Sequence, residues 1–135
     1  MDKKYLNPEN FTNIMGSYSH GLRINIGDYD MFFVTGQIAM DKDGKAVAPD
    51  DIVKQTEFVF KNIQTILLEG GAKLDDVVKA VIYVTDISKF KEISAIRNKY
   101  FANSKPVSTL VEINRTVKDG CDIEIDVIAM KKFEK

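Results

Sequence analysis

The sequence predicts an α+β fold in which two helices cover one face of a mixed β-sheet. Three observations predict it: segments in which apolar and polar residues alternate, two segments whose apolar residues recur every three or four positions, and the order of these segments. In chain order they read β-β-α-β-α-β-β. Because no linker or internal repeat separates them, we expect the 135 residues to form a single domain, 1–135.

The first two strands are predicted at residues 19–27 and 31–36. In the first, Leu22, Ile24 and Ile26 alternate with polar residues, and the turn "GDYD" separates it from "MFFVTG". This arrangement is typical of a hairpin. A polar N-terminal arm precedes the pair, and a second turn, "DKDGK" at 41–45, follows it.

A long helix is predicted at residues 50–71. Its apolar positions fall along one stripe: Ile52, Phe58 or Val59, Ile63, Ile66 and Leu67. Acidic residues stand at its N-terminal end, where the helix dipole favours them, and Gly70 and Gly71 end it.

The second half of the chain repeats the alternation of strand and helix. A β-branched strand is predicted at 77–86 and a second helix at 87–101, with Phe90, Ile93, Ile96 or Arg97, and Tyr100 on one side. The last two strands are predicted at 107–115 and 122–131, joined by "TVKDGC".

The composition excludes several classes of function. The net charge of −1 provides neither a broad basic field for nucleic acid nor a polybasic segment for anionic lipid. One histidine and one cysteine do not make a zinc site, and no phosphate-binding or dinucleotide-binding glycine motif occurs, so we expect no metal and no cofactor. The single Cys121 and the absence of an apolar leader predict a cytoplasmic protein.

The strands also predict that the chain self-associates. "MFFVTG" and "VVKAVIYV" are apolar on both of their sides, whereas two helices cover only one face of the sheet. The second face must then meet another sheet, and the chain has no strands left to build one. A homo-oligomer is the economical solution.

The last strand carries three carboxylates on one side. Asp122, Glu124 and Asp126 are two residues apart, and Ile123, Ile125 and Val127 fill the gaps. Because successive side chains of a strand point to opposite faces, the acids share one face and the apolar residues the other. This is either the solvated face of a half-buried strand or a place where one carboxylate acts chemically.

Five segments resemble the RidA/YjgF family of reactive-intermediate imine deaminases, some members of which are also described as L-PSP endoribonucleases or translation inhibitors. They are "GSYSHG" (16–21), "VTGQIAMDKDGK" (34–45), residues 55–86, "KPVSTLVEI" (105–113) and "IEIDVIAM" (123–130), and the likeness spans about residues 14–131. The resemblance implies a chorismate-mutase-like fold and a homotrimer. It also implies clefts between subunits, in which 2-aminoacrylate-type enamines and imines are hydrolysed to 2-oxo acids and ammonia.

The resemblance also implies site residues. Glu124 matches the cleft carboxylate that holds the attacking water, and Tyr18 matches a tyrosine that lines the cleft. Thr35, Gly36 and Gln37 match an S-G-Q turn that offers backbone groups to the substrate, although packing roles remain open for Tyr18 and for this turn. Hydrolysis of a C=N bond needs a placed water and a group that shuttles a proton, and a carboxylate at a subunit interface has a raised pKa that suits this.

Two other polar residues have plainer interpretations. His20 is the only histidine, and a local hydrogen-bonding role is favoured over catalysis. Cys121 begins a strand and has only that one histidine to activate it, so it is a poor nucleophile candidate.

Two site positions of the family pattern have changed together in this chain. Ser108 stands where the pattern P-A-R-S-x-V-E places the arginine that binds the substrate carboxylate. Loss of such a pair weakens binding of a 2-imino acid roughly ten- to a hundredfold or more. Arg115 is too far along the same strand, roughly 20 Å away, to replace it. Arg97 stands where the family has tyrosine, and Ser94 where it often has asparagine.

Two functions therefore remain, and the first is slightly favoured. In the first, the protein hydrolyses an enamine or imine of altered class, Glu124 holds water, and the hydroxyls of Ser108 and Thr109 contact the substrate. In the second, it is a non-catalytic trimer that binds or senses a small ligand. A third function, ribonuclease or translation inhibitor, has no support from the flat charge balance.

Overall fold

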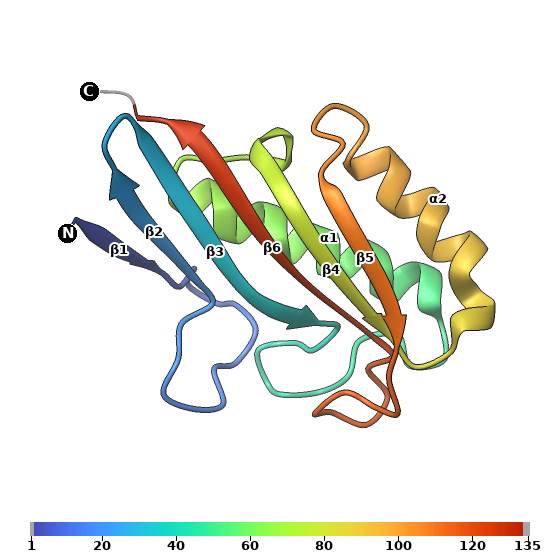
Figure 1. Cartoon of the computed structure of the whole chain (residues 1–135). Coiled ribbons are helices and arrows are strands. Elements are labelled where there is room, and N and C mark those ends of the chain that lie inside the picture. The colour runs from blue at the N-terminus through green and yellow to red at the C-terminus, as the bar shows by residue number, and fades with distance from the viewer. Residues whose placement is uncertain (1, 134–135) are drawn as a thin grey trace.

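The computed structural model describes residues 2–133 and shows a six-stranded sheet with two helices packed behind it (Figure 1). The strands are β1 (Lys3–Leu6), β2 (Gly21–Ile26), β3 (Tyr29–Ile38), β4 (Val77–Val84), β5 (Val107–Glu112) and β6 (Ile123–Lys132); the helices are α1 (Ile52–Glu69) and α2 (Phe90–Tyr100), and 3₁₀ turns η1 (Leu74–Asp76) and η2 (Ile87–Lys89) precede β4 and α2. The strand order is β1-β2-β3-β6-β4-β5. Only β4 and β5 pair in parallel, so the sheet is mixed.

The predicted fold class is confirmed, and the seven predicted elements occur in the predicted order. The N-terminal arm is the exception, because Lys3–Leu6 forms an additional edge strand that pairs antiparallel with β2. The strand has four residues, of which only Leu6 is buried. A segment this short, with one buried residue, shows no alternating pattern in the sequence. Several bounds also differ: β3 extends to Tyr29–Ile38, β4 ends at Val84 instead of residue 86, α2 begins at Phe90 instead of residue 87, and the strand predicted at 107–115 ends at Glu112.

The core lies between the sheet and α1. The predicted stripe of α1 is correct for Val59, Ile63, Ile66 and Leu67, all of which are fully buried. On β6, Ile123, Ile125 and Val127 point into this core, so the carboxylates between them point to the other face of the sheet. On α2, Ile93 and Ile96 are buried, whereas Phe90, which was expected on the buried side, is 45% exposed.

Both ends of α1 are closed by polar contacts. The Asp51 side chain caps the N-terminus by accepting the Lys54 N–H at 3.0 Å. At the C-terminus, three cations from three different strands donate to the last carbonyls: Lys4 to Glu69 at 3.3 Å, Arg23 to Gly70 at 3.2 Å and Lys131 to Gly71 at 2.8 Å. Carbonyls that lack a helical partner and the negative end of the helix dipole both favour cations here.

Three loops gather at one end of the sheet, where β3 ends and β6 begins (Figure 1). The buried side chain of Gln55 on α1 joins two of them, because its Nε2 donates to Val47 O at 3.1 Å and to Gly120 O at 2.5 Å. Its Oε1 accepts the Asp122 N–H at 2.9 Å. One amide of the helix therefore fixes the start of β6 and the loops beside it.

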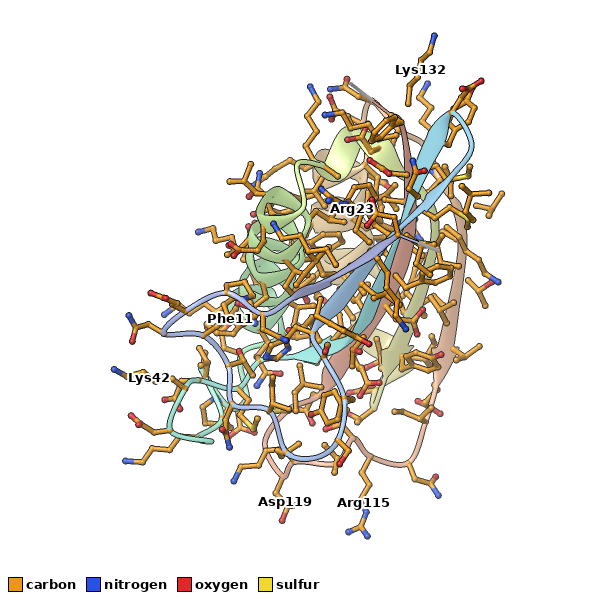
Figure 2. All side chains as sticks on the ribbon, turned by 90° about the vertical axis from the view of Figure 1, so that its left-hand side faces the viewer. Phe11, Arg23, Lys42, Arg115, Asp119 and Lys132 are labelled. Atoms are coloured by element: carbon orange, nitrogen blue, oxygen red, sulfur yellow. The ribbon has the colours of Figure 1, made fainter. Side chains whose placement is uncertain are left out.

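The face of the sheet that the helices do not cover is largely apolar. Figure 2 shows α1 on one side of the strands and no helix on the other. Phe33, in the middle of this face, pairs with Leu22 on β2 and with Ile128 on β6, and it is 38% exposed. Among the described residues, no helix is long and apolar enough to cross a membrane.

Candidate functional site

A cavity of about 360 Å³ lies at the loop end of the sheet. It is lined by the loop that precedes β2, the end of β3, the loop that precedes β6, and one residue of β6: Thr12, Asn13, Met15, Tyr18, His20, Thr35, Gly36, Gln37, Ile38, Met40, Val117 and Glu124. Five residues that the sequence nominated, Tyr18, Thr35, Gly36, Gln37 and Glu124, are therefore together in one cavity.

The three carboxylates of the last strand differ in their partners. Asp122 accepts a hydrogen bond from the Thr85 hydroxyl at 3.1 Å, and Asp126 accepts one from the Tyr83 hydroxyl at 3.2 Å. The Glu124 carboxylate between them accepts no hydrogen bond from any residue of the described range 2–133. A half-buried carboxylate without a protein donor is costly unless something else satisfies it. Glu124 is thus the one acid of the three that is available to a ligand or a water.

The surroundings of Glu124 favour its protonated form. Burial raises the pKa of its carboxyl group, and the negative charge of Asp126 on the same face raises it further. A carboxyl group with a raised pKa exchanges protons more readily near neutral pH, which is the property a general acid–base needs.

A β-bulge in β3 creates the space for this side chain. Val34 pairs with Val127 and Gln37 with Ile125, so Thr35 and Gly36 together face one residue of β6. A Cβ atom at position 36 would lie 2.9 Å from Glu124 Cγ and 2.8 Å from Cδ, distances that force the side chain to move. Because glycine at position 36 has no side chain, the Glu124 carboxyl group can lie against the bulge.

The floor of the cavity is a buried hydrogen-bond network. His20 Nε2 donates to Thr12 O at 2.7 Å, and His20 Nδ1 accepts from Gln37 Nε2 at 3.2 Å. Asn62 on α1 donates to Thr12 Oγ1 at 2.9 Å and to Gln37 Oε1 at 3.4 Å. Both ring nitrogens of His20 have hydrogen-bond partners, which confirms its hydrogen-bonding interpretation.

Thr12 and Asn62 are residues of this network that sequence reasoning missed. Asn62 carried a signal, because it lies on the apolar stripe of α1 between Val59 and Ile66, where a polar residue is unexpected and needs a partner. Thr12 carried none, since it lies in an irregular loop. Its hydroxyl donates to Met40 O at 2.7 Å and so ties that loop to the end of β3.

Tyr18 lies at the rim of the cavity, and two nominated residues lie outside it. Tyr18 is 42% exposed, and its hydroxyl accepts the Met15 N–H at 3.2 Å. Ser108 and Thr109 lie outside this cavity in a single chain, because they are on edge strand β5 and β4 separates that strand from β6. Their contact with a substrate stays a prediction.

Cys121 keeps the plain interpretation that its sequence position indicated. The Cys121 thiol is buried and donates to Ala39 O at 3.2 Å, and burial raises its pKa, so it is a poor nucleophile. Within residues 2–133, no group of three or more His, Cys, Asp or Glu side chains is arranged to hold a metal ion.

Comparisons with known proteins agree with the fold. The family model described as "Endoribonuclease L-PSP" matches residues 10–131. A RutC family protein of Pyrococcus abyssi is 36% identical over 132 residues, which cover 98% of this chain and 100% of the relative.

Two solved structures illustrate the structural likeness. A Rid family protein, YyfA of Yersinia pestis, is 32% identical with a TM-score of 0.82, and the match covers 95% of this chain and 98% of that one. TdcF of E. coli, solved with bound serine, is 25% identical with a TM-score of 0.81, and the match covers 96% and 99% of the two chains. The chain belongs to the RidA/YjgF/L-PSP family.

Proposed function

We propose that this protein is a hydrolytic deaminase of small reactive enamines and imines, with Glu124 as the catalytic acid–base. The observation that carries the proposal is the environment of the Glu124 carboxyl group. It is half-buried, its pKa is raised, and it lies in a cavity against Gly36 without a hydrogen-bond donor among residues 2–133. Such a group combines a desolvation cost with access to a ligand, which is typical of an active-site residue.

The reaction needs only a water and this carboxylate. Ionised Glu124 accepts a proton from water as the water oxygen attacks the C=N carbon, and it delivers that proton to the nitrogen, which gives a tetrahedral carbinolamine. The carboxylate then takes the hydroxyl proton and passes it to the amine nitrogen as the C–N bond breaks and the C=O bond forms. One imine and one water thus give one carbonyl compound and one ammonia. An enamine enters the same sequence after protonation at carbon.

The walls of the cavity suit a small substrate. Backbone groups at the bulge, the rim hydroxyl of Tyr18 and the Thr35 side chain surround a volume of about 360 Å³. TdcF, which is similar in fold, was solved with serine, a molecule of this size class. In a homotrimer, we expect a neighbouring subunit to close the open side and to bring its own Ser108 and Thr109 towards the cleft.

The cavity is less suited to cleaving RNA, the activity named in the family description. Its lining contains no lysine or arginine, and the one carboxylate carries negative charge when ionised. Binding a phosphate backbone needs cations at the site. We therefore favour a small imine over a polynucleotide.

The test is release of 2-oxo acid from 2-aminoacrylate or 2-iminobutyrate generated in situ. Wild type is expected to accelerate release, and Glu124→Gln, which keeps the size of the side chain, is expected to lose roughly a hundredfold or more of that acceleration. Gly36→Ala, which leaves the carboxylate in the chain but displaces it, is expected to show a comparable loss. Equal rates for wild type and Glu124→Gln would overturn the assignment.

The alternative is a trimer that binds a small ligand without chemistry, and Ser108 is the observation that favours it. The arginine expected at that position by resemblance is absent, so the carboxylate of a 2-imino acid lacks a bidentate partner there. Inactive wild type whose activity appears in Ser108→Arg would indicate a different substrate class. Inactivity of both, together with ligand-dependent shifts of the melting temperature across a panel of metabolites, would indicate a binding protein.

A further inference from the structure

Tyr83 on β4 is the cross-strand partner of Glu124 on the neighbouring strand β6 (Figure 1). Ile82 and Val84 on either side of it are buried in the core, so the Tyr83 side chain points to the helix-free face, which is also the face of Glu124. Residues that face each other across antiparallel strands have Cβ atoms about 4.5–5.5 Å apart. The side chain of Tyr83 therefore begins beside that of Glu124.

The hydroxyl of Tyr83 bonds to the next acid along the strand. It donates to Asp126 Oδ2 at 3.2 Å, although the cross-strand partner of Asp126 is Val81, so the tyrosine side chain extends diagonally across the face. Burial raises the pKa of Tyr83, and the charges of Asp126 and Glu124 raise it further. The phenol thus keeps its proton and acts as a hydrogen-bond donor to the Asp126 carboxylate.

Asp126 is the charged neighbour that matters most for Glu124. Besides burial, its negative charge is what raises the pKa of the Glu124 carboxyl group. The Asp122 carboxylate, which is also two residues from Glu124, is bonded by Thr85 at the end of β4. The other titratable side chains that β4 and the loop before β2 present beside these acids are Lys79, Tyr18 and His20, and β3 presents the uncharged Thr35, Gly36 and Gln37.

We propose, on the basis of the deaminase function above, that Tyr83 is a positioning residue, which acts on Glu124 through Asp126 by holding that carboxylate beside it. Because like charges repel, an Asp126 side chain without this hydrogen bond turns away from Glu124 or takes up a proton itself. Either change removes negative charge from the neighbourhood of Glu124. The glutamate then ionises at lower pH and is a weaker base towards water, which slows a reaction that begins with proton transfer to Glu124.

The test is a pH titration of the Glu124 carboxyl group by ¹³C NMR, with protein labelled at the glutamate side chains and Glu124→Gln to identify the signal. We expect the titration midpoint to move to lower pH in both Tyr83→Phe and Asp126→Asn. The double variant should have the midpoint of Asp126→Asn alone, because the hydroxyl acts through that carboxylate. An unchanged midpoint in Tyr83→Phe, or additive shifts in the double variant, would overturn the proposal.

The pH dependence of deamination is the second measurement. Tyr83 and Asp126 lie outside the lining of the Glu124 cavity, so both variants should lower kcat severalfold and move its acidic limb to lower pH, while KM stays unchanged. A purely structural role of Tyr83 would not move the limb.

A matched control and the two measurements together separate this proposal from the deaminase function. Thr85→Val removes the hydroxyl that bonds Asp122, the acid on the other side of Glu124, and should leave the NMR midpoint and the acidic limb unchanged. An inactive wild type that shows the expected NMR shifts would contradict the deaminase function and support the coupling of Tyr83 to Glu124. An active wild type whose Glu124 midpoint does not respond to Tyr83→Phe would do the reverse.

Discussion

The surroundings of Glu124 raise the pKa of its carboxyl group, which suits proton transfer. The same surroundings lower the stability of the folded protein when this carboxyl group is ionised. Burial and the charge of Asp126 raise its pKa in the folded chain above the ordinary value of a glutamate. Between the unfolded and the folded pKa the native state binds more protons, so stability falls as pH rises through this window. Above the window the loss is complete and constant. Active sites commonly carry such a cost.

We therefore predict that Glu124→Gln stabilises the protein in a pH-dependent manner. The amide cannot ionise, so the gain in melting temperature over wild type should be largest near pH 7 and should shrink as pH falls towards 4, where wild-type Glu124 is protonated. Thermal unfolding of both proteins across this range measures the difference. Glu9→Gln, at an exposed loop position, is the control and should show no such trend. Parallel stability curves for wild type and Glu124→Gln would contradict the assignment of a raised pKa.

The residue scale also shows where sequence reasoning reached its limit. Alternation placed Asp122, Glu124 and Asp126 on one face, and the structure agrees. Alternation could not distinguish them, because the distinction depends on Thr85 and Tyr83, whose hydroxyls bond the outer two acids from the neighbouring strand and its end. The resemblance identified Glu124 for a reason that the residues alone did not supply.

At the scale of elements, the loop end of the molecule depends on contacts from α1. Gln55 satisfies Val47 O, Gly120 O and the Asp122 N–H, and so connects two loops and the start of β6 to one helix position. Sequence patterning predicted the helix, but a buried glutamine has no period that would reveal its three partners. The same limit applies to the C-terminus of α1, whose last turn has no basic residue and whose carbonyls are bonded by cations from β1, β2 and β6.

We predict that Gln55→Met lowers the free energy of unfolding by roughly 3 kcal/mol or more. Methionine has a similar size but leaves three part-buried backbone groups without their partners, and each costs about 1 kcal/mol or more. Denaturant unfolding monitored by circular dichroism measures the change. Gln64→Met, at an exposed position of the same helix, is the matched control and should change stability by less than about 0.5 kcal/mol. Equal effects of the two substitutions would show that the Gln55 contacts contribute little.

At the scale of the whole molecule, the order of elements and the layering were predictable, but the neighbours in space were not. The alternation and the two helical stripes were enough for an α+β fold with both helices on one face. Strand order is set by long-range pairing, as in β6 inserting between β3 and β4, and short-range patterns do not encode it. For this reason the sequence did not indicate which residues surround Arg97. The fold brings it into one cavity with Ser108.

The helix-free face carries the last prediction, which concerns self-association. Its apolar side chains extend across the sheet from β2 to β5, with Leu22, Ile24, Met31, Phe33, Ile128, Met130, Val81 and Val111 on the same side. Many exposed apolar side chains on one sheet face are unusual on a protein that stays monomeric, and strands apolar on both sides are typical of sheets buried on both faces. We expect this face to be the contact between subunits of a homotrimer.

Phe33→Lys is predicted to convert the oligomer to a folded monomer. Phe33 is 38% exposed in the single chain, so lysine can extend into solvent there, whereas a buried interface would have to desolvate an unpaired charge. Sedimentation velocity measures the mass, and circular dichroism checks that the fold persists. Leu68→Lys places the same charge at an apolar residue that is 70% exposed on the helix side, and it should leave the oligomer intact. A monomeric wild type at micromolar concentration, or an unchanged mass for Phe33→Lys, would contradict the trimer. The first result would also leave the Glu124 cavity without the neighbouring subunit that we expect to complete it.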